Sequence, residues 1–294
     1  MQYELVWIET KDKLELYGLL KEAKTKDKIL INIHGTAGNF YEEDFIANFA
    51  EELPKVGISI LSTNNRGAYV YDAYQKSGAA TEKFEDCLID IDTWIEFVLN
   101  NGYKGVVLSG HSLGAEKVVY YMTYGKYKNK VKAIILLGPA DSYGSHRVLD
   151  GKDNTKIRKN VESLLEESKK LIANGKDNIF LNRYAYGSHE GIMPKSADSF
   201  VNFLGKGSKV VEALPFHIKR LDNYSKIRVP IIVIIGDQNE YTAIPIKDAL
   251  ELMKKENKLT QTVQLKNCNH DFEGKEEELA EIIKEFLVKN FKPK

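Results

Sequence analysis

The chain has 294 residues, of which 43% are hydrophobic and 29% charged, which is typical of a globular protein with a sizeable core. The 42 basic residues balance the 42 acidic ones, so we expect no electrostatic attraction to nucleic acid or to an anionic membrane. The apolar runs are too short to span a bilayer, and the N-terminus lacks the pattern of a signal peptide.

The first predicted elements are two amphipathic strands over residues 3–8 and 14–19, joined by a charged turn that indicates a hairpin. Six further short apolar runs follow and alternate with helical patterns. They cover residues 29–33, 58–61, 106–108, 131–137, 231–235 and 262–265. Near-continuous apolar strands separated by helices predict an α/β fold with a mostly parallel, eight-stranded sheet that helices cover on both faces.

One long stretch departs from this alternation. Between Pro139 and Lys226 no strand-like apolar run occurs, whereas residues 157–172 have a strong helical periodicity and a shorter helix is expected over residues 197–204. Roughly 85 residues is too long for an ordinary loop. We therefore predict an inserted helical segment.

The predicted domain organisation is a core of residues 1–140 and 226–294, with a helical cap over residues 141–225 inserted after the sixth strand. Caps on open α/β sheets commonly overhang the ligand crevice at the strand ends. The aromatic side chains of this cap are expected either to suit a medium-sized acyl or aromatic substrate or to pack the cap against the sheet. They include Tyr184, Tyr186, Phe200, Phe203 and Phe216.

The strand at 106–108 leads into a Gly-x-Ser-x-Gly sequence, residues 110–114, which a helical pattern follows. In this strand–turn–helix context the serine lies on a strained turn, and the two glycines avoid collisions with neighbouring backbone. The helix N-terminus places partial positive charge near a developing oxyanion. We therefore predict that Ser112 is a nucleophile and that His111, at a variable position of the motif, is structural.

A serine is a poor nucleophile unless a base accepts its proton. Of the six histidines, His270 is the best placed, because it lies in the loop between the last strand and the final helix. Serine enzymes whose nucleophile lies on a Gly-x-Ser-x-Gly turn have the nucleophile earlier in the chain and the histidine near its end. For His146, His189 and His217, in or beside the insertion, surface or substrate-facing roles are expected.

A glycine-rich turn, residues 34–38, follows the third strand and can direct a backbone N–H toward a tetrahedral intermediate. We assign the oxyanion hole to the N–H groups of Thr36 and Leu113. His34 is expected to brace this turn by hydrogen bonding, and Arg66, at the end of the next strand, to form an anchoring ion pair.

Three motifs, HGTAG at 34–38, GHSLG at 110–114 and NHDF at 269–272, resemble the α/β-hydrolase superfamily, and the resemblance covers essentially the whole chain. Longer segments are similar to a poorly characterised bacterial group of intracellular hydrolases. They read HGTAGNFY, STNNRG, EKFEDCLIDI and GHSLGAEKVVYY. The superfamily resemblance implies the α/β-hydrolase fold and an acyl-enzyme mechanism with a Ser–His–acid triad, acting usually on esters.

The sequence departs from the superfamily at the triad acid. The superfamily usually has an aspartate three residues after the glycine that closes the seventh strand, and here that position is Asn239. An amide can accept the imidazole N–H but has no charge to stabilise an imidazolium. Glu240, one residue on and one methylene longer, is our preferred acid, followed by Asp237 and by Asp141 after the sixth strand.

The sequence thus predicts a carboxylic-ester hydrolase that acts on a small-molecule ester or acyl substrate and requires no metal or organic cofactor. Its two cysteines lack zinc-ligand spacing and favour a reducing compartment, so we expect a cytoplasmic location. The same site is also compatible with acyl transfer to an alcohol and with amide or C–C cleavage. Asn239 favours a further alternative, a non-catalytic ligand-binding receptor on the same fold.

Overall fold

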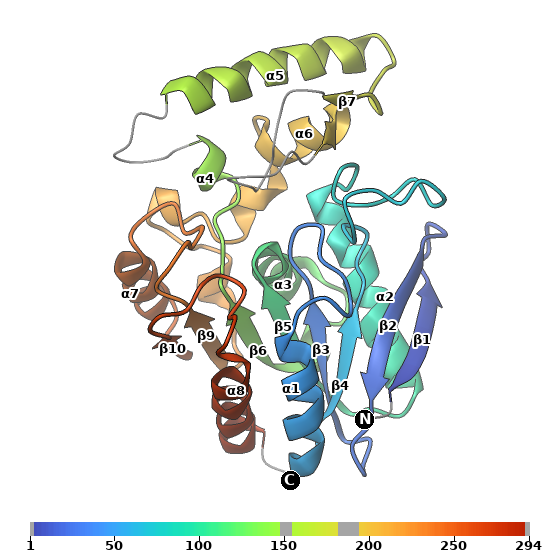
Figure 1. The fold of residues 1–294 in the computed structure, drawn as a ribbon, viewed down its shortest axis with the longest axis vertical. Coiled ribbons are helices and arrows are strands. Elements are labelled where there is room, and N and C mark those ends of the chain that lie inside the picture. Colours follow the sequence, from blue (N-terminus) through green and yellow to red (C-terminus); the bar gives the residue numbers. More distant parts are fainter. Residues whose placement is uncertain (1–2, 148–154, 182–193, 292–294) are drawn as a thin grey trace.

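The computed structural model describes residues 3–147, 155–181 and 194–291, and the side chains of residues 155–160 lie outside the description. Eight strands form one sheet in the order β1-β2-β4-β3-β5-β6-β9-β10 (Figure 1). The strands are β1 (Glu4–Glu9), β2 (Glu15–Lys21), β3 (Lys28–Ile33), β4 (Ser59–Thr63), β5 (Gly105–His111), β6 (Val131–Leu137), β9 (Ile231–Ile235) and β10 (Thr260–Gln264). Strand β2 pairs antiparallel with β1 and β4, and the other pairs are parallel. The predicted hairpin and eight-stranded, mostly parallel sheet are confirmed.

Helices cover both faces of this sheet (Figure 1). One face carries α1 (Phe45–Glu52) and α8 (Glu276–Asn290), and the other carries α2 (Cys87–Asn100), α3 (Leu113–Tyr124) and α7 (Ile246–Glu256). In β3, Ile29 and Ile31 belong to the core beneath α2 and α3, whereas Leu30 between them belongs to the core beneath α1 and α8. Because central strands such as β3 and β9 are buried on both faces, their sequences are nearly continuous apolar runs.

Between β6 and β9 the chain contains an insertion whose labelled helices lie beyond the carboxyl ends of the central strands (Figure 1). It contains α4 (Gly144–Arg147), α5 (Thr155–Ala173), α6 (Ala197–Leu204) and a two-stranded antiparallel sheet of β7 (Phe180–Leu181) and β8 (Lys195–Ser196). Helix α6 has the predicted bounds, and α5 extends slightly beyond them. The small sheet was not predicted, because two-residue strands carry no measurable periodicity. Short 3₁₀ helices complete the chain at Leu53–Val56, Phe84–Asp86, Lys128–Lys130, Lys209–Glu212, Phe216–Ile218 and Tyr224–Lys226.

The aromatic side chains of the insertion have a packing role where the structure describes them. Phe200, Phe203 and Phe216 are fully buried, and none of them lines the large cavity described below. Phe203 packs edge-on against Phe84, with ring centroids 6.1 Å apart. Of the two roles expected for these three residues, the substrate-facing one is therefore wrong, while Tyr184 and Tyr186 lie outside the described residues.

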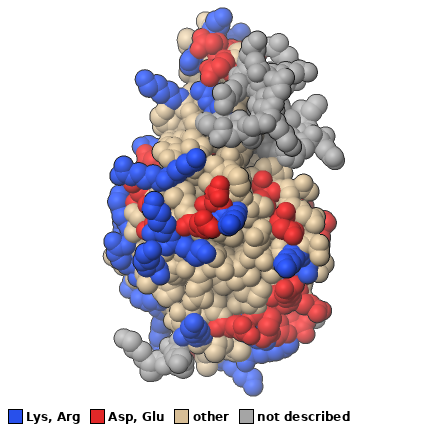
Figure 2. Space-filling model, turned by 90° about the vertical axis from the view of Figure 1, so that its left-hand side faces the viewer, with Lys and Arg blue, Asp and Glu red and all other residues tan. Residues whose placement is uncertain are grey.

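The surface charge is mixed. Figure 2 shows one face on which basic side chains gather mainly along one side and acidic ones mainly toward the opposite lower edge. Among the helices that the structure describes, none is long and apolar enough to cross a membrane.

Candidate active site

The predicted site residues follow the carboxyl ends of neighbouring parallel strands, which meet at one edge of the sheet. His34 follows β3, Ser112 follows β5, and Gly236 follows β9. Ligands of open α/β sheets bind in crevices at this edge. A cavity of about 840 Å³ lies here, and Thr36, Ser112 and His270 are among the residues that line it.

Ser112 occupies a strained backbone conformation between β5 and α3, with φ 55° and ψ −122°. Its N–H donates a hydrogen bond to the carbonyl of Leu137, 2.9 Å away. A side chain at Gly110 would collide with the backbone of Gly114, and one at Gly114 would collide with the carbonyl of Ile33. The glycine spacing of the motif therefore has the steric cause that the sequence analysis assumed.

His270 contacts a carboxylate on the side away from its unpartnered nitrogen. Its Nδ1 donates to Glu240 Oε2 over 2.7 Å, while Glu240 Oε1 accepts the N–H of Gly236 over 2.9 Å. The side chain of Glu240 is fully buried and that of His270 is 11% exposed. His270 Nε2 has no hydrogen-bond partner among the described residues, so it retains a lone pair for a proton. Tyr241 packs edge-on against the ring, with centroids 4.7 Å apart.

The other candidate acids contact different groups. Asp237 is exposed and accepts the backbone N–H groups of Asn267 and Cys268, which lower the pKa of its carboxyl. Asp141 is buried and accepts from His217 Nδ1 over 2.7 Å. Asn239 lines the cavity but makes no hydrogen bond to His270.

The two N–H groups assigned to the oxyanion hole belong to Leu113, directly after Ser112, and to Thr36, in the turn after β3. Leu113 begins α3, where backbone N–H groups have no partner within the helix. An added Cβ at Gly35, just before Thr36, would be 2.9 Å from Ser112 Cβ, so this turn approaches the serine closely. Neither the Thr36 N–H nor the Leu113 N–H donates a hydrogen bond to another group among the residues that the structure describes.

His34 is buried beneath the same turn. Its Nδ1 donates to the carbonyl of Gly35 over 2.7 Å, and its Nε2 accepts the N–H of Asn65 over 3.1 Å. Burial, reinforced by the positive charge of Lys117, lowers the pKa of His34 to about 4. The neutral ring thus joins two backbone segments, which agrees with the bracing role expected for it.

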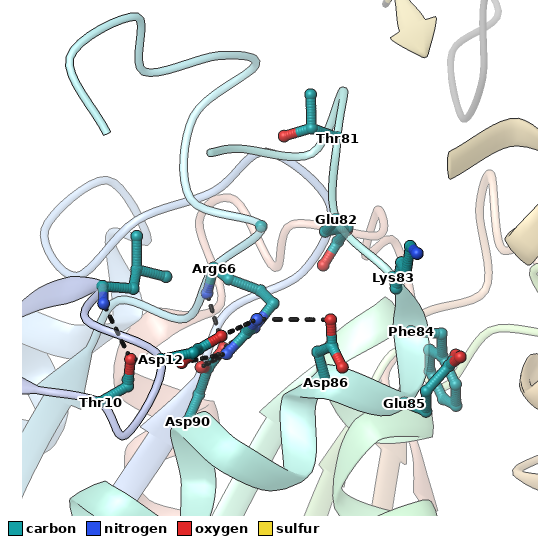
Figure 3. A network of polar contacts seen from close by, with 12 residues as sticks. Thr10, Asp12, Arg66, Thr81, Glu82, Lys83, Phe84, Glu85, Asp86 and Asp90 are labelled. Carbon is teal, nitrogen blue, oxygen red and sulfur yellow. Dashed lines mark hydrogen bonds and ion pairs between the residues drawn. The ribbon is translucent and has the colours of Figure 1, made fainter. Parts of the chain in front are cut away.

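Arg66 forms an ion-pair network with three aspartates (Figure 3). Its guanidinium contacts Asp90 at 2.7 Å, Asp12 at 2.9 Å and Asp86 at 3.4 Å, and its own N–H donates to Asp90. The Arg66 side chain is 10% exposed and does not line the cavity. The structure therefore agrees with the expected anchoring ion pair.

Two residues beside His270 were missed by sequence reasoning. Gly138, directly after β6, has φ 47°, and an added Cβ would be 3.0 Å from the His270 ring. Glu43, in the turn before α1, accepts from Nδ1 of His111 over 2.9 Å. The run of three acidic residues at 42–44 gives no signal that singles out the middle one.

The histidines of the insertion differ in their surroundings. His146 lines the cavity, and its Nδ1 contacts the carbonyl of Ser142 at 2.8 Å. His217 pairs with Asp141, as described above, and His189 lies outside the described residues. Of the two insertion histidines that the structure describes, His146 lines the cavity and His217 does not, and a substrate-facing role for His146 stays a prediction.

Carboxylates form part of the cavity wall. Glu42 and Asp44 precede α1, and Asp271 follows His270; all three are exposed and line the cavity. No lysine or arginine belongs to the described lining. The wall of this cavity is therefore acidic.

A serine on a strained strand–turn–helix, placed at the carboxyl edge of an eight-stranded sheet of this order, defines the protein as an α/β-hydrolase. Residues 24–273 match the family model described as serine aminopeptidase, S33, and the chain belongs to this family. No curated protein matches the sequence.

Solved structures share the fold at low sequence identity. Est1E from Butyrivibrio proteoclasticus, solved with ferulic acid bound, has a TM-score of 0.68 and 18% identity, covering 98% of this chain and 100% of that one. The α/β-hydrolase GrgF from Penicillium sp. sh18 has a TM-score of 0.69 and 16% identity, covering 99% of both chains. The esterase Pf2001 from Pyrococcus furiosus has a TM-score of 0.61 and 16% identity, covering 98% and 92%.

Proposed function

We propose that the protein is a serine hydrolase of carboxylic esters, with Ser112 as nucleophile, His270 as base and Glu240 as acid. The observation that carries this proposal is the buried Glu240–His270 hydrogen bond of 2.7 Å, in the cavity that the strained Ser112 also lines. Glu240 supplies the charge that Asn239 lacks, which removes the main reason to favour a non-catalytic receptor.

In the proposed reaction, Ser112 Oγ attacks the ester carbonyl and its proton passes to His270 Nε2. The carboxylate of Glu240 stabilises the resulting imidazolium through Nδ1. The N–H groups of Thr36 and Leu113 stabilise the negative oxygen of the tetrahedral intermediate. His270 then protonates the leaving alcohol, and water attacks the acyl-enzyme with His270 again as base.

We further propose that residues 141–225 are a cap over this site, inserted in a core of residues 1–140 and 226–294. The position of α5 and α6 beyond the strand ends supports this assignment (Figure 1). Ser142, Ser145 and His146, at the start of the insertion, line the cavity. The cytoplasmic location expected from the sequence stays a prediction.

The ester preference draws support from esterases of the same fold, whereas the family description favours a second candidate, amide cleavage at an N-terminal residue. Both reactions use an acyl-enzyme at Ser112, as would acyl transfer to an alcohol or C–C cleavage. A panel of activated esters of increasing acyl length, with matched anilides of amino acids, separates ester from amide hydrolysis.

The decisive test compares Ser112→Ala with Ser145→Ala, a matched serine change in the same cavity. We expect Ser112→Ala to lower turnover of an activated ester by about a thousandfold or more and to abolish labelling by a fluorophosphonate. Ser145→Ala, which loses only a hydrogen bond to the Tyr241 carbonyl, should keep most of the activity. A Ser112→Ala enzyme with more than about a tenth of the parent rate would refute the proposed nucleophile.

A further inference from the structure

A second histidine–carboxylate pair lies directly beside His270. His111 Nδ1 contacts Glu43 Oε1 at 2.9 Å, and His111 Nε2 contacts the backbone carbonyl of His270 at 2.9 Å. The two imidazole rings are 4.9 Å apart between centroids. Glu43 Oε2 in turn accepts from the side-chain amide of Asn32 over 2.8 Å. The contacts thus join the turn before α1, the β5–α3 turn and the loop that carries His270.

Both ring nitrogens of His111 face acceptors, a carboxylate and a carbonyl. A neutral imidazole has one donor only, so both contacts are hydrogen bonds only when the ring is an imidazolium. Burial opposes this charge, but the hydrogen bond that His111 donates to Glu43 and the negative charge of Glu43 outweigh burial and raise the pKa of His111 to about 9. The side chains of His111 and Glu43 are 7% and 10% exposed, so water screens their attraction little.

We propose that Glu43 and charged His111 are a positioning pair, which fixes the backbone of His270 and thereby aims its Nε2 at Ser112. The inference rests on the proposed function of His270. It adds a role for two residues outside the proposed triad. Because a displacement of about 1 Å at a catalytic group can cost a hundredfold in rate, a hydrogen bond to the His270 backbone suffices for such an effect.

Titratable and aromatic side chains surround His111. The titratable residues that face it are Glu43, His270 and Asp271, and α1 and the His270 loop contribute the rings of Phe45 and Phe272. When His111 loses a proton, one of its nitrogens becomes an acceptor and one hydrogen bond breaks. Either break loosens the link from Glu43 to the His270 backbone, so turnover should decline as the pH rises through about 9.

Two amide substitutions of His111 separate its two hydrogen bonds. The amide nitrogen of His111→Gln is in reach of the His270 carbonyl, whereas that of His111→Asn is in reach of Glu43 only. We expect kcat on an activated ester to fall less than about tenfold in His111→Gln and about a hundredfold in His111→Asn, with little change in KM. The alkaline decline of the pH profile should disappear in His111→Gln, because an amide does not titrate.

A purely structural role predicts that kcat falls in each variant only in proportion to its loss of stability, whichever of the two hydrogen bonds it keeps. Equal kcat in both variants, or an alkaline decline that persists in His111→Gln, overturns the proposal. Labelling by a fluorophosphonate distinguishes the two failures. If the label does not require Ser112, the proposed function has failed; if it does require Ser112 but the two His111 variants behave alike, only the positioning role has failed.

A measurement on the unchanged protein covers the case in which a variant fails to fold. Nitrogen-15 NMR of the histidine rings should show His111 with both nitrogens protonated at pH 7 and with one proton lost near pH 9. Through-space contacts of the His111 ring with the rings of Phe45 and Phe272 assign its resonances in the unchanged protein. A neutral His111 at pH 7 overturns the proposal without any activity assay.

Discussion

At the scale of single residues, the contact of Glu240 with His270 depends on the backbone conformation of Asn239. Asn239 has φ 56°, in the left-handed region that asparagine tolerates better than most residues. The turn that this conformation creates directs the next side chain, Glu240, into the protein toward His270. Its additional methylene relative to aspartate extends the carboxylate to Nδ1, and Gly236 holds the second oxygen.

Replacing Glu240 by glutamine keeps its shape and removes its charge. We expect Glu240→Gln to lower kcat by about three to four orders of magnitude, because the imidazolium loses its charge partner and the ring can adopt the wrong tautomer. Asp237→Asn, in the same loop, should leave kcat nearly unchanged. Steady-state kinetics of the two variants on one activated ester provide the measurement, and a nearly silent Glu240→Gln beside an inactive Asp237→Asn would transfer the role to Asp237.

The sequence limited the acid to a few candidates but did not rank them by geometry. Asp237, Asn239 and Glu240 lie in one four-residue stretch, 237–240, after the same strand. The choice among them depends on backbone angles that no spacing encodes. Glu43 escaped prediction for another reason. Its partner His111 is 68 residues away along the chain, and a single long-range pair leaves no periodic signal.

At the scale of elements, a buried ion pair connects α3 to the loop that precedes α2. Lys117, on α3, contacts Glu82 at 2.7 Å and the side-chain carbonyl of Asn65 at 2.8 Å. Both ionic side chains are 1% exposed. Glu82 lies close to the Arg66 network (Figure 3), so the residues after β4 are held by two separate sets of charges.

Removing one member of this pair leaves the other charge buried without compensation. We expect Lys117→Met to lower the free energy of unfolding by about 3–5 kcal/mol, and Lys117→Met/Glu82→Leu to recover most of the loss. Urea unfolding of the three proteins tests this, with Lys104→Ala, which removes an exposed pair with Asp27, as the control that should not shift the midpoint. A double variant no more stable than the single one would contradict the explanation.

The elements themselves show what periodicity can predict. Helix α6 was predicted with its observed bounds because its apolar positions recur at helical spacing before a glycine. Central strands such as β3 and β9 were found because burial on both faces makes them apolar runs, and β1 and β2 were found because their burial alternates. The pairing of Phe180 with Ser196 was not found, because a two-residue strand depends on its partner and not on its own sequence.

At the scale of the whole molecule, two buried histidines with opposite pKa shifts link stability to pH. The pKa of His34 falls from 6.5 to about 4, so the unfolded chain binds more protons between these values and His34 destabilises the fold as the pH falls through them. The pKa of His111 rises from 6.5 to about 9, so its contribution is complete below 6.5 and is lost as the pH rises through 9.

The contribution of His111 is therefore testable by subtraction. The free energy of unfolding of the parent should exceed that of His111→Gln by an amount that shrinks by about 3 kcal/mol between pH 6 and pH 9.5. Urea titrations across this range supply the measurement, and the acid limb set by His34 should be common to both proteins. A gap that stays constant with pH would show that His111 is not charged in the folded state.

The acidic wall of the cavity has a consequence for the end of the proposed reaction. A neutral ester approaches Glu42, Asp44 and Asp271 without repulsion, but hydrolysis converts its acyl half into a carboxylate. Negative charge then faces negative charge within a concave surface, where fields are stronger than in open water. In the proposed reaction these side chains would therefore favour release of the product acid, which clears the site for the next molecule.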